Sequence, residues 1–249
     1  MCLILFGYRV DASCPLIVAA NRDEFHGRAA AAANFWTDNN DILAGRDKVA
    51  GGTWLGCTRT GRFAALTNFS TAEDPEEPKS RGGLVHGFLA GSDTAEYYAH
   101  HLHGVDYAGY NLLLFDGKDL VCTSNRGTTE VLTPGYYGLS NAELGARWSK
   151  CIQGAQHLER WVKSGFEHED LVAMLRDEHV PADDELPQRG RPIEMERRVA
   201  PSFIMGDEYG TRATTVIELG TDRISFSEQS YAAGGVATGS VRYEVERLN

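Results

Sequence analysis

Short apolar stretches separated by turn-forming residues occupy both ends of this chain, and helical patterns lie between them. We expect strands at residues 2–8 and 16–20, joined as a hairpin, and at 42–44, 53–57, 63–68, 110–115, 120–123, 214–219, 224–227 and 241–245. Helices are expected over 84–103, with a break near Gly91 and a cap at Ser92 or Asp93, over 146–163 and over 169–177. Because hairpins join antiparallel strands, this order favours an α+β domain on antiparallel sheets over a parallel, doubly wound one.

The chain length allows one large domain or two small ones, since 249 residues is about 1.7 times a typical domain. Residues 70–80 and 181–198 combine proline with charge and lack a periodic apolar pattern, so we expect exposed loops there. Neither loop divides the chain into halves that could each bury a core. Glycine contributes 27 residues, an excess that fits many tight turns between short strands.

Charge and cysteine content exclude several classes of protein. The formal net charge is −11, and a strongly acidic chain repels phosphate backbones, so nucleic acid is not an expected partner. No stretch approaches the roughly 20 apolar residues of a transmembrane helix, and the first apolar run is too short for a secretory signal. The five cysteines are scattered without a CxxC pair, which indicates neither a disulfide framework nor a zinc site. We therefore expect a cytoplasmic protein.

Cys2 is the position with the most direct chemical meaning. If an aminopeptidase removes Met1, Cys2 becomes the N-terminal residue and carries both a thiol nucleophile and an α-amine. An α-amine has a pKa of about 8 and can take the proton of the thiol. The alternative is that Cys2 is a buried free cysteine in the first strand. Taken alone, the Met1-Cys2 pair favours this alternative over a nucleophile, because cysteine is commonly buried.

A charged segment, Asn21-Arg22-Asp23-Glu24, follows directly on an apolar strand. Rigid elements hold charged groups in register, so this is a good place for a site. Strand alternation would send Arg22 and Glu24 to one face and Asn21 and Asp23 to the other. The alternative is a charged surface turn with local salt bridges.

Three further positions could complete such a site. Asn68 and Asn141 each come at the end of an expected strand, and Arg212 lies at the start of another. Asparagine amides can donate to a developing oxyanion, and arginine can hold a carboxylate. Each signal is weak alone, because asparagine at a strand end is usually part of a turn.

Taken together, these segments resemble the NRDE family, which is named for its Asn-Arg-Asp-Glu motif and includes transport and Golgi organisation proteins of animals. The matching segments run in order along the chain: Met1-Cys2, Asn21–Phe25, Gly51–Gly56, Ala64–Asn68, Ser80–Gly82, Tyr110–Leu112, Tyr137–Asn141 and Tyr209–Arg212. Because the resemblance spans the whole chain, it implies a single domain over residues 1–249.

The resemblance implies an N-terminal-nucleophile (Ntn) hydrolase-like fold, a four-layer αββα sandwich of two antiparallel sheets. It also extends to the cysteine Ntn hydrolases, such as bile-salt hydrolases and penicillin V acylases. Carried over position by position, it implies the catalytic set Cys2, Arg22, Asp23, Asn68, Asn141 and Arg212, and the ligand-binding set Asn21, Arg22, Asp23, Glu24 and Arg81. One departure stands out: the hydrolases separate their Arg and Asp by two residues, whereas Arg22 and Asp23 are adjacent. Either Asp23 or Glu24 could therefore take the carboxylate role.

Two functions of different classes follow from this resemblance. In the first, the protein is a carrier that binds and traffics haem, or another amphipathic ligand such as acyl-coenzyme A. In the second, Cys2 attacks an amide, ester or thioester carbonyl after removal of Met1, and Asn68 and Asn141 stabilise the oxyanion; this reaction requires no cofactor. Both imply a hydrophobic or amphipathic small-molecule partner, and neither gives an oligomeric state.

The sequence identifies no metal ligand. Side chains that can ligate haem iron gather near the first helical pattern: His86, Tyr97, Tyr98, His100, His101 and His103. Histidines at a helix end are more often solvated residues that complement the helix dipole. The basic cluster Arg189, Arg191, Arg197 and Arg198 could receive propionates or a phosphate; the alternative is a solvated loop, since loops usually run exposed. The four tryptophans are expected in the core.

Overall fold

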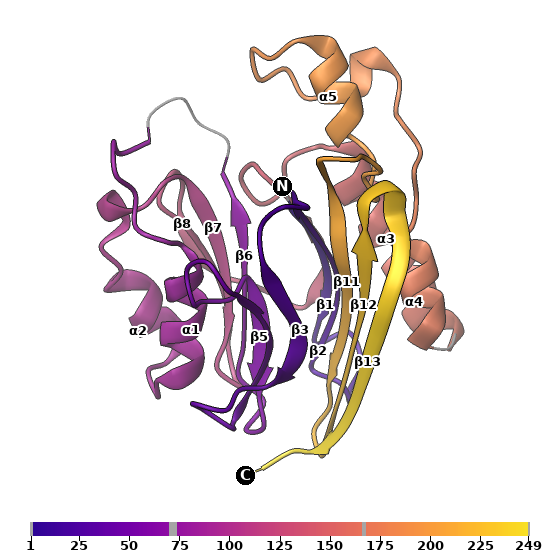
Figure 1. Ribbon diagram of the computed structural model, residues 1–249. Helices are drawn as coiled ribbons and strands as arrows, with labels where there is room; N and C mark the ends of the chain where they lie inside the picture. Colours follow the sequence, from indigo (N-terminus) through magenta and orange to yellow (C-terminus); the bar gives the residue numbers. More distant parts are fainter. Residues whose placement is uncertain (1, 70–73, 166–167, 249) are drawn as a thin grey trace.

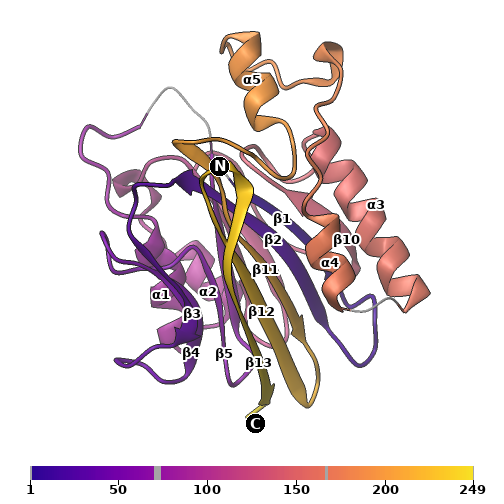
Figure 2. The same cartoon turned by 45° about the vertical axis from the view of Figure 1, so that its right-hand side comes forward.

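A computed structural model describes residues 2–69, 74–165 and 168–248. Within these ranges, thirteen strands form two antiparallel sheets that pack face to face (Figures 1 and 2). The six-stranded sheet has the order β10-β1-β2-β11-β12-β13, and the seven-stranded sheet runs from β3 to β9 in sequence order. The six-stranded sheet consists of β1 (Cys2–Tyr8), β2 (Leu16–Phe25), β10 (Gly135–Leu139), β11 (Tyr209–Leu219), β12 (Arg223–Ala232) and β13 (Val236–Glu246). The other sheet holds β3 (Ala30–Phe35), β4 (Ile42–Asp47), β5 (Leu55–Thr58), β6 (Phe63–Asn68), β7 (Tyr110–Phe115), β8 (Leu120–Ser124) and β9 (Thr129–Val131).

Helices cover the outer face of each sheet. In Figure 1, α1 (Gly82–Ala90) and α2 (Ala95–His100) lie against the seven-stranded sheet, and α3 (Ser149–Ser164) and α4 (His168–Met174) lie against the other. A fifth helix, α5 (Ile193–Val199), projects beyond the end of the sandwich where the chain begins. Short 3₁₀ turns occur at Gly104–Asp106, Asp183–Glu185 and Ala233–Gly235. The predicted α+β class and the four-layer αββα arrangement are confirmed.

Three hydrophobic clusters fill the spaces between the layers. Alternation along β1 sends Ile4 and Phe6 into the cluster between the sheets, while Leu3 and Leu5 pack under α3. The third cluster lies between the seven-stranded sheet and helices α1 and α2. Because β1 and β2 are buried on both faces, their apolar runs are continuous, as expected for central strands.

The helix pattern around residue 150 was only partly correct. The helix expected over 146–163 begins at Ser149, and it buries Cys151, Gly154 and Leu158 while Ile152 is exposed. A Cβ at Gly154 would lie 2.6 Å from Leu5 Cδ1, so glycine at this position lets α3 approach β1 closely. The helix ends at Gly165, which adopts the left-handed conformation that favours glycine.

Several boundaries also differ from the sequence-based expectations. The cap of α2 is Thr94, whose side chain accepts from the Tyr97 amide, and not Ser92 or Asp93. The segment 181–198 is not only loop, because it contains a 3₁₀ turn and most of α5. The segment 70–80 lies partly outside the described residues. No helix within the described ranges is long and apolar enough to cross a membrane.

Candidate functional site

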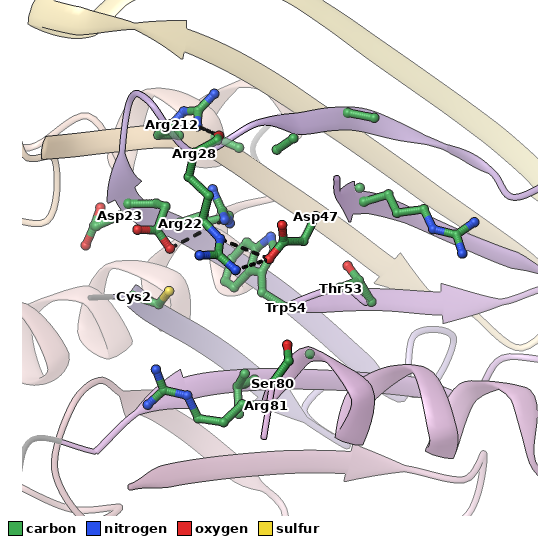
Figure 3. Close-up of a pocket in the computed structure, with 18 of the residues that line it drawn as sticks. Cys2, Arg22, Asp23, Arg28, Asp47, Thr53, Trp54, Ser80, Arg81 and Arg212 are labelled. Atoms are coloured by element: carbon green, nitrogen blue, oxygen red, sulfur yellow. Dashed lines mark hydrogen bonds and ion pairs between the residues drawn. The ribbon is translucent and has the colours of Figure 1, made fainter. Parts of the chain in front are cut away.

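A cavity of about 580 Å³ lies between the two sheets at the end of the sandwich where β1 begins (Figure 3). From the six-stranded sheet it is lined by the start of β1, the end of β2, the start of β11 and parts of β12 and β13. From the other sheet it is lined by β3, β4, the segment just before β5, and β6, and it also borders the start of α1. Seven predicted site residues line it: Cys2, Arg22, Asp23, Glu24, Asn68, Arg81 and Arg212. Two others, Asn21 and Asn141, do not.

Cys2 is the first residue of β1 and pairs with Arg22 in the antiparallel register, so the two side chains share a face. The Cys2 side chain is 8% exposed. Burial raises the pKa of its thiol, and a hydrogen bond from the Asp23 backbone opposes this shift only in part. The thiol is therefore protonated at neutral pH, and a base is needed before it can act as a nucleophile.

Alternation along β2 is as predicted, and the whole motif lies within the strand rather than after it. Arg22 and Glu24 form an ion pair with a 3.6 Å separation. Asp23 leaves the strand in the direction opposite to Arg22 (Figure 3) and accepts a hydrogen bond of 2.7 Å from Thr211 Oγ1. Burial raises the pKa of the Asp23 carboxyl.

Asn21 is fully buried on the helix-facing side of β2, away from the cavity. Its Nδ2 donates to Leu175 O at 2.8 Å and to Ser202 O at 2.7 Å, and its Oδ1 accepts from Thr214 Oγ1 at 2.6 Å. The structure therefore places this predicted ligand-binding residue behind the site, where it ties β2 to the segments after α4 and before β11.

The two asparagines that were predicted as oxyanion donors lie next to each other. Asn141 Nδ2 donates to Asn68 O at 2.7 Å, and Asn141 Oδ1 accepts from Ser140 Oγ at 3.1 Å. Asn68 lines the cavity at the end of β6, while Asn141 is buried behind it. In this arrangement Asn141 contacts the Asn68 backbone, and Asn68 is the residue that faces the cavity.

A β-bulge directs Arg212 into the site. The register between β11 and β2 shifts between Thr211 and Ala213, which leaves Arg212 without a partner residue, and such a bulge re-aims the side chain. Arg212 Nη1 donates to Phe25 O at 3.2 Å and to Arg28 O, while its buried Nε has no hydrogen-bond partner among the described residues. Burial and the neighbouring Arg22 lower the pKa of this guanidinium.

Arg81 approaches the cavity from the opposite sheet, below Cys2 in Figure 3. Its Nη1 donates to Gly109 O at 2.8 Å. Burial lowers the pKa of the Arg81 guanidinium, and the nearby Asp74 and Glu24 oppose this shift. Arg22, Arg81 and Arg212 thus bring three cations toward the same space.

The sequence analysis missed several residues that line the cavity. Arg28 and Asp47 both line it and form an ion pair, in which Arg28 Nε and Nη2 donate to Asp47 Oδ2 at 3.0 and 2.6 Å. Trp54, which was expected in the core, lines the cavity, whereas Trp36 is 2% exposed and lies in the core. Ala30, Ala31, Ala32 and Glu228 form another wall. The Gly51–Gly56 and Ser80–Gly82 segments are part of the family resemblance and could have pointed to Thr53, Trp54 and Ser80. Nothing in the sequence indicates that β3 of one sheet lies near β12 of the other.

The cavity is more cationic than the chain as a whole. The cations lining it are Arg22, Arg28, Arg46, Lys79, Arg81 and Arg212, and the acids are Asp23, Glu24, Asp47 and Glu228. No group of three or more potential metal-binding side chains (His, Cys, Asp, Glu) occurs in the described part of the chain. The histidines that could ligate haem iron lie elsewhere: the His86 ring lies 5.1 Å from the Trp36 ring in a tilted arrangement, and His100, His101 and His103 are exposed on the far side of the seven-stranded sheet.

The basic cluster near α5 is also separate from the cavity. Arg189 pairs with the buried Glu196, and Arg197 pairs with Asp183, so two of its four guanidinium groups are already neutralised. These ion pairs hold the α5 segment together and leave its other two arginines, Arg191 and Arg198, exposed.

Comparison with solved structures supports the fold. An N-acylethanolamine-hydrolyzing acid amidase (NAAA) ortholog from Caenorhabditis elegans superposes with a TM-score of 0.54 at 10% identity, over 88% of this chain and 93% of that chain. A mutant (C2A) conjugated bile acid hydrolase from Clostridium perfringens gives a TM-score of 0.53 at 10% identity, over 99% and 92% of the two chains. The Ntn-hydrolase-like fold that the resemblance implied is thereby confirmed.

Sequence comparison identifies the family. The Transport and Golgi organization protein 2 homologs of Homo sapiens and Bos taurus are each 37% identical to this chain over 256 residues, covering 92% of it and 93% of their own length. The Drosophila melanogaster Transport and Golgi organization protein 2 is 24% identical, with 92% of each chain covered. A family model described as Transport and Golgi organisation 2 matches residues 1–233. The chain, with its NRDE motif at residues 21–24, therefore belongs to the Transport and Golgi organisation 2 family.

Proposed function

We propose that the cavity binds an amphipathic anionic small molecule, with haem as the first candidate and an acyl-coenzyme A as the second. The observation that carries the proposal is the approach of Arg22, Arg81 and Arg212 to one space in a chain of net charge −11. A carboxylate or phosphate would relieve their mutual repulsion and accept their hydrogen bonds. Ala30–Ala32, Trp54 and Leu66 supply the apolar wall that such a ligand also needs.

Haem would be held as cargo through its propionates. Cys2 offers a sulfur ligand for the iron, but burial raises the pKa of its thiol and so disfavours the thiolate that binds iron. We therefore expect the arginines to contribute more of the haem affinity than Cys2 does. An acyl-coenzyme A would place its phosphates on the same guanidinium groups and its acyl chain along the alanine wall.

Spectroscopic titration with haemin and displacement of a fluorescent acyl-coenzyme A would test this proposal. Arg81→Ala should weaken binding of either ligand by about tenfold to a hundredfold, the loss expected for a charge-assisted hydrogen bond. Cys2→Ser should change haemin affinity less than Arg81→Ala does. Arg197→Ala, which removes an arginine of the α5 ion pairs outside the cavity, is the control and should leave binding unchanged. Equal affinities of the Arg81→Ala and parent proteins would contradict the proposal.

A second candidate function is hydrolysis of an amide, ester or thioester bond by Cys2. It is favoured by one observation: Cys2, Asn68 and Asp23 line the same cavity, in a fold shared with hydrolases. Met1 lies outside the described residues, and its removal is a requirement of this reaction. Cys2 Sγ would then attack the carbonyl carbon as its α-amine takes the thiol proton and passes it to the leaving group, which is an amine, an alcohol or a thiol according to the bond cleaved. Water would hydrolyse the resulting thioester and regenerate the thiol.

The hydrolase candidate predicts a processed N-terminus. Intact-mass measurement of the purified protein should show loss of Met1, and an electrophilic amide probe should add to Cys2 of the parent protein but not of Cys2→Ser. Retention of Met1 removes this mechanism, because the α-amine of Cys2 would then be part of a peptide bond.

A further inference from the structure

Glu228 is a buried carboxyl group at the wall of the cavity that neither candidate function has used. It lies on β12, is 5% exposed, and faces the space between the two sheets. Its neighbours along the strand, Phe226 and Ile224, belong to the hydrophobic core between the sheets. Burying a carboxyl group in such surroundings costs free energy unless hydrogen bonds compensate for it, so the contacts of each oxygen need an account.

One oxygen of Glu228 ties the two sheets together. Glu228 Oε1 accepts the Ala33 backbone N–H at 2.8 Å, although Ala33 belongs to β3 of the other sheet. Ala33 lies where the β3–β4 register shifts between Ala31 and Asn34, so this stretch of β3 departs from regular pairing. Glu228 therefore satisfies a buried N–H at a bulge and fixes the position of the neighbouring Ala30–Ala32 wall.

The other oxygen of Glu228 makes a weaker contact with the protein than Oε1 does. Among residues 2–69, 74–165 and 168–248, the one hydrogen bond that Glu228 Oε2 accepts is a long one of 3.4 Å from Thr215 Oγ1. It lies 3.6 Å from the place that a Cβ on Gly45 would occupy, and Gly45 also lines the cavity. The absence of a side chain at Gly45 thus leaves space beside this oxygen.

The surroundings of Glu228 favour the neutral acid. Both groups that donate to it, a backbone N–H and a hydroxyl, are uncharged. Burial raises the pKa of the Glu228 carboxyl; the two hydrogen bonds and the more distant Arg22 oppose this without reversing it. A neutral Glu228 carries one proton, and because Oε1 accepts from Ala33, the proton belongs on Oε2.

We propose that Glu228 is a positioning and specificity-determining residue: Oε1 holds the bulged strand β3 in place as a cavity wall, and the Oε2 hydroxyl donates a hydrogen bond to an oxygen of the bound ligand. This inference rests on the proposed binding function and adds to it. A ligand with an oxygen acceptor at this depth, such as a carboxylate or carbonyl, is selected over one with an ammonium or amide N–H there. An anionic oxygen is accepted because the acid carries no opposing charge.

Two substitutions separate the roles of the two oxygens. Glu228→Gln keeps a carbonyl oxygen for Ala33 and an N–H donor in place of the hydroxyl, so it imitates the neutral acid. Glu228→Leu removes both. We expect Glu228→Gln to bind haemin and palmitoyl-coenzyme A within about threefold of the parent protein, and Glu228→Leu to lose about tenfold or more.

The pH profile supplies a measurement that a purely structural role would not move. Affinity of the parent protein should fall as pH rises through the Glu228 titration, whereas the affinity of Glu228→Gln should not show this step. Infrared difference spectra between the parent and Glu228→Gln should contain the C=O stretch of a protonated carboxyl at neutral pH. A carboxylate spectrum, or identical pH profiles of the two proteins, would overturn the inference.

Failure of the binding function is distinguishable from failure of this inference. If neither ligand binds the parent protein, the proposed function is wrong, and with it the donor role of Oε2. The wall role is then decided separately by amide hydrogen exchange at Ala33, which should be fast in Glu228→Leu and slow in Glu228→Gln. Fast exchange in both variants, or slow exchange in both, would contradict the wall role as well.

Discussion

Replacement of Asn21 by alanine should destabilise the protein without changing the chemistry of the cavity. Alanine removes three buried hydrogen bonds of 2.8, 2.7 and 2.6 Å and leaves Leu175 O, Ser202 O and Thr214 Oγ1 without these partners. At about 1 kcal/mol for each net hydrogen bond, and more where the remaining group stays dry, the loss is about 3–5 kcal/mol. That is a large part of the 5–15 kcal/mol that stabilises a typical protein.

Urea denaturation of Asn21→Ala beside Arg22→Ala would test this assignment. Arg22 lines the cavity, and its 3.6 Å ion pair with Glu24 is loose, so we expect Arg22→Ala to lose less than about 1.5 kcal/mol of stability while losing ligand affinity. Asn21→Asp offers a matched control, because it keeps Oδ1 for Thr214 but turns a second oxygen toward two carbonyls, and it should be no more stable than Asn21→Ala. A stable Asn21→Ala protein that fails to bind ligand would refute the structural role and restore Asn21 as a ligand contact.

Three further perturbations follow from the packing and the charges. Gly138→Ala should destabilise the protein by about 1–3 kcal/mol, because its Cβ would lie 2.4 Å from Cys151 O of α3; an unchanged melting temperature would contradict this packing. Burial opposes ionisation of Asp47, but the hydrogen bonds from Arg28 and from the Val49 and Ala50 amides together outweigh it and lower the carboxyl pKa. The resulting stability is present at neutral pH and is lost as pH falls through the folded-state pKa. Asp47→Asn should therefore flatten the acid side of the stability curve below the unfolded-state carboxyl pKa of about 4. His168→Ala should lower the free energy of unfolding, measured by calorimetry, by about 1–3 kcal/mol. The hydrogen bonds of the His168 ring to Glu218 and Ser227, at 2.5 and 2.6 Å, join α4 to β11 and β12.

The layers of this fold could be predicted because apolar patterning reports burial directly. Segments 2–8, 16–20 and 110–115 are buried on both faces of central strands, and their continuous apolar runs show it. Strand β13 was predicted only over 241–245 because its first half is exposed and polar. The same limit applies to α5, a seven-residue helix whose only fully buried residue is the charged Glu196.

The site was predictable where residues adjacent in sequence act together and not where two sheets meet. Arg22 and Glu24 were placed correctly on one face because alternation within a strand depends on local geometry. The same alternation could not say which face of β2 borders the cavity, and so it could not separate Asn21 from Arg22. Trp54 was expected in the core, because an apolar wall of a cavity has the same composition as a core.

Departures from regular strand pairing explain the rest of the site. The β11 bulge supplies Arg212 without a partner residue, and the β3 register shift supplies the Ala33 N–H that Glu228 binds. Both are local irregularities in strand pairing that is otherwise set by the apolar pattern. A side chain at such a position can therefore be replaced without changing how the strands pair. On the proposed binding function, we expect ligand selectivity to vary through Arg212, Glu228 and Gly45, while Asn21 and the core between the sheets keep the same cavity in place.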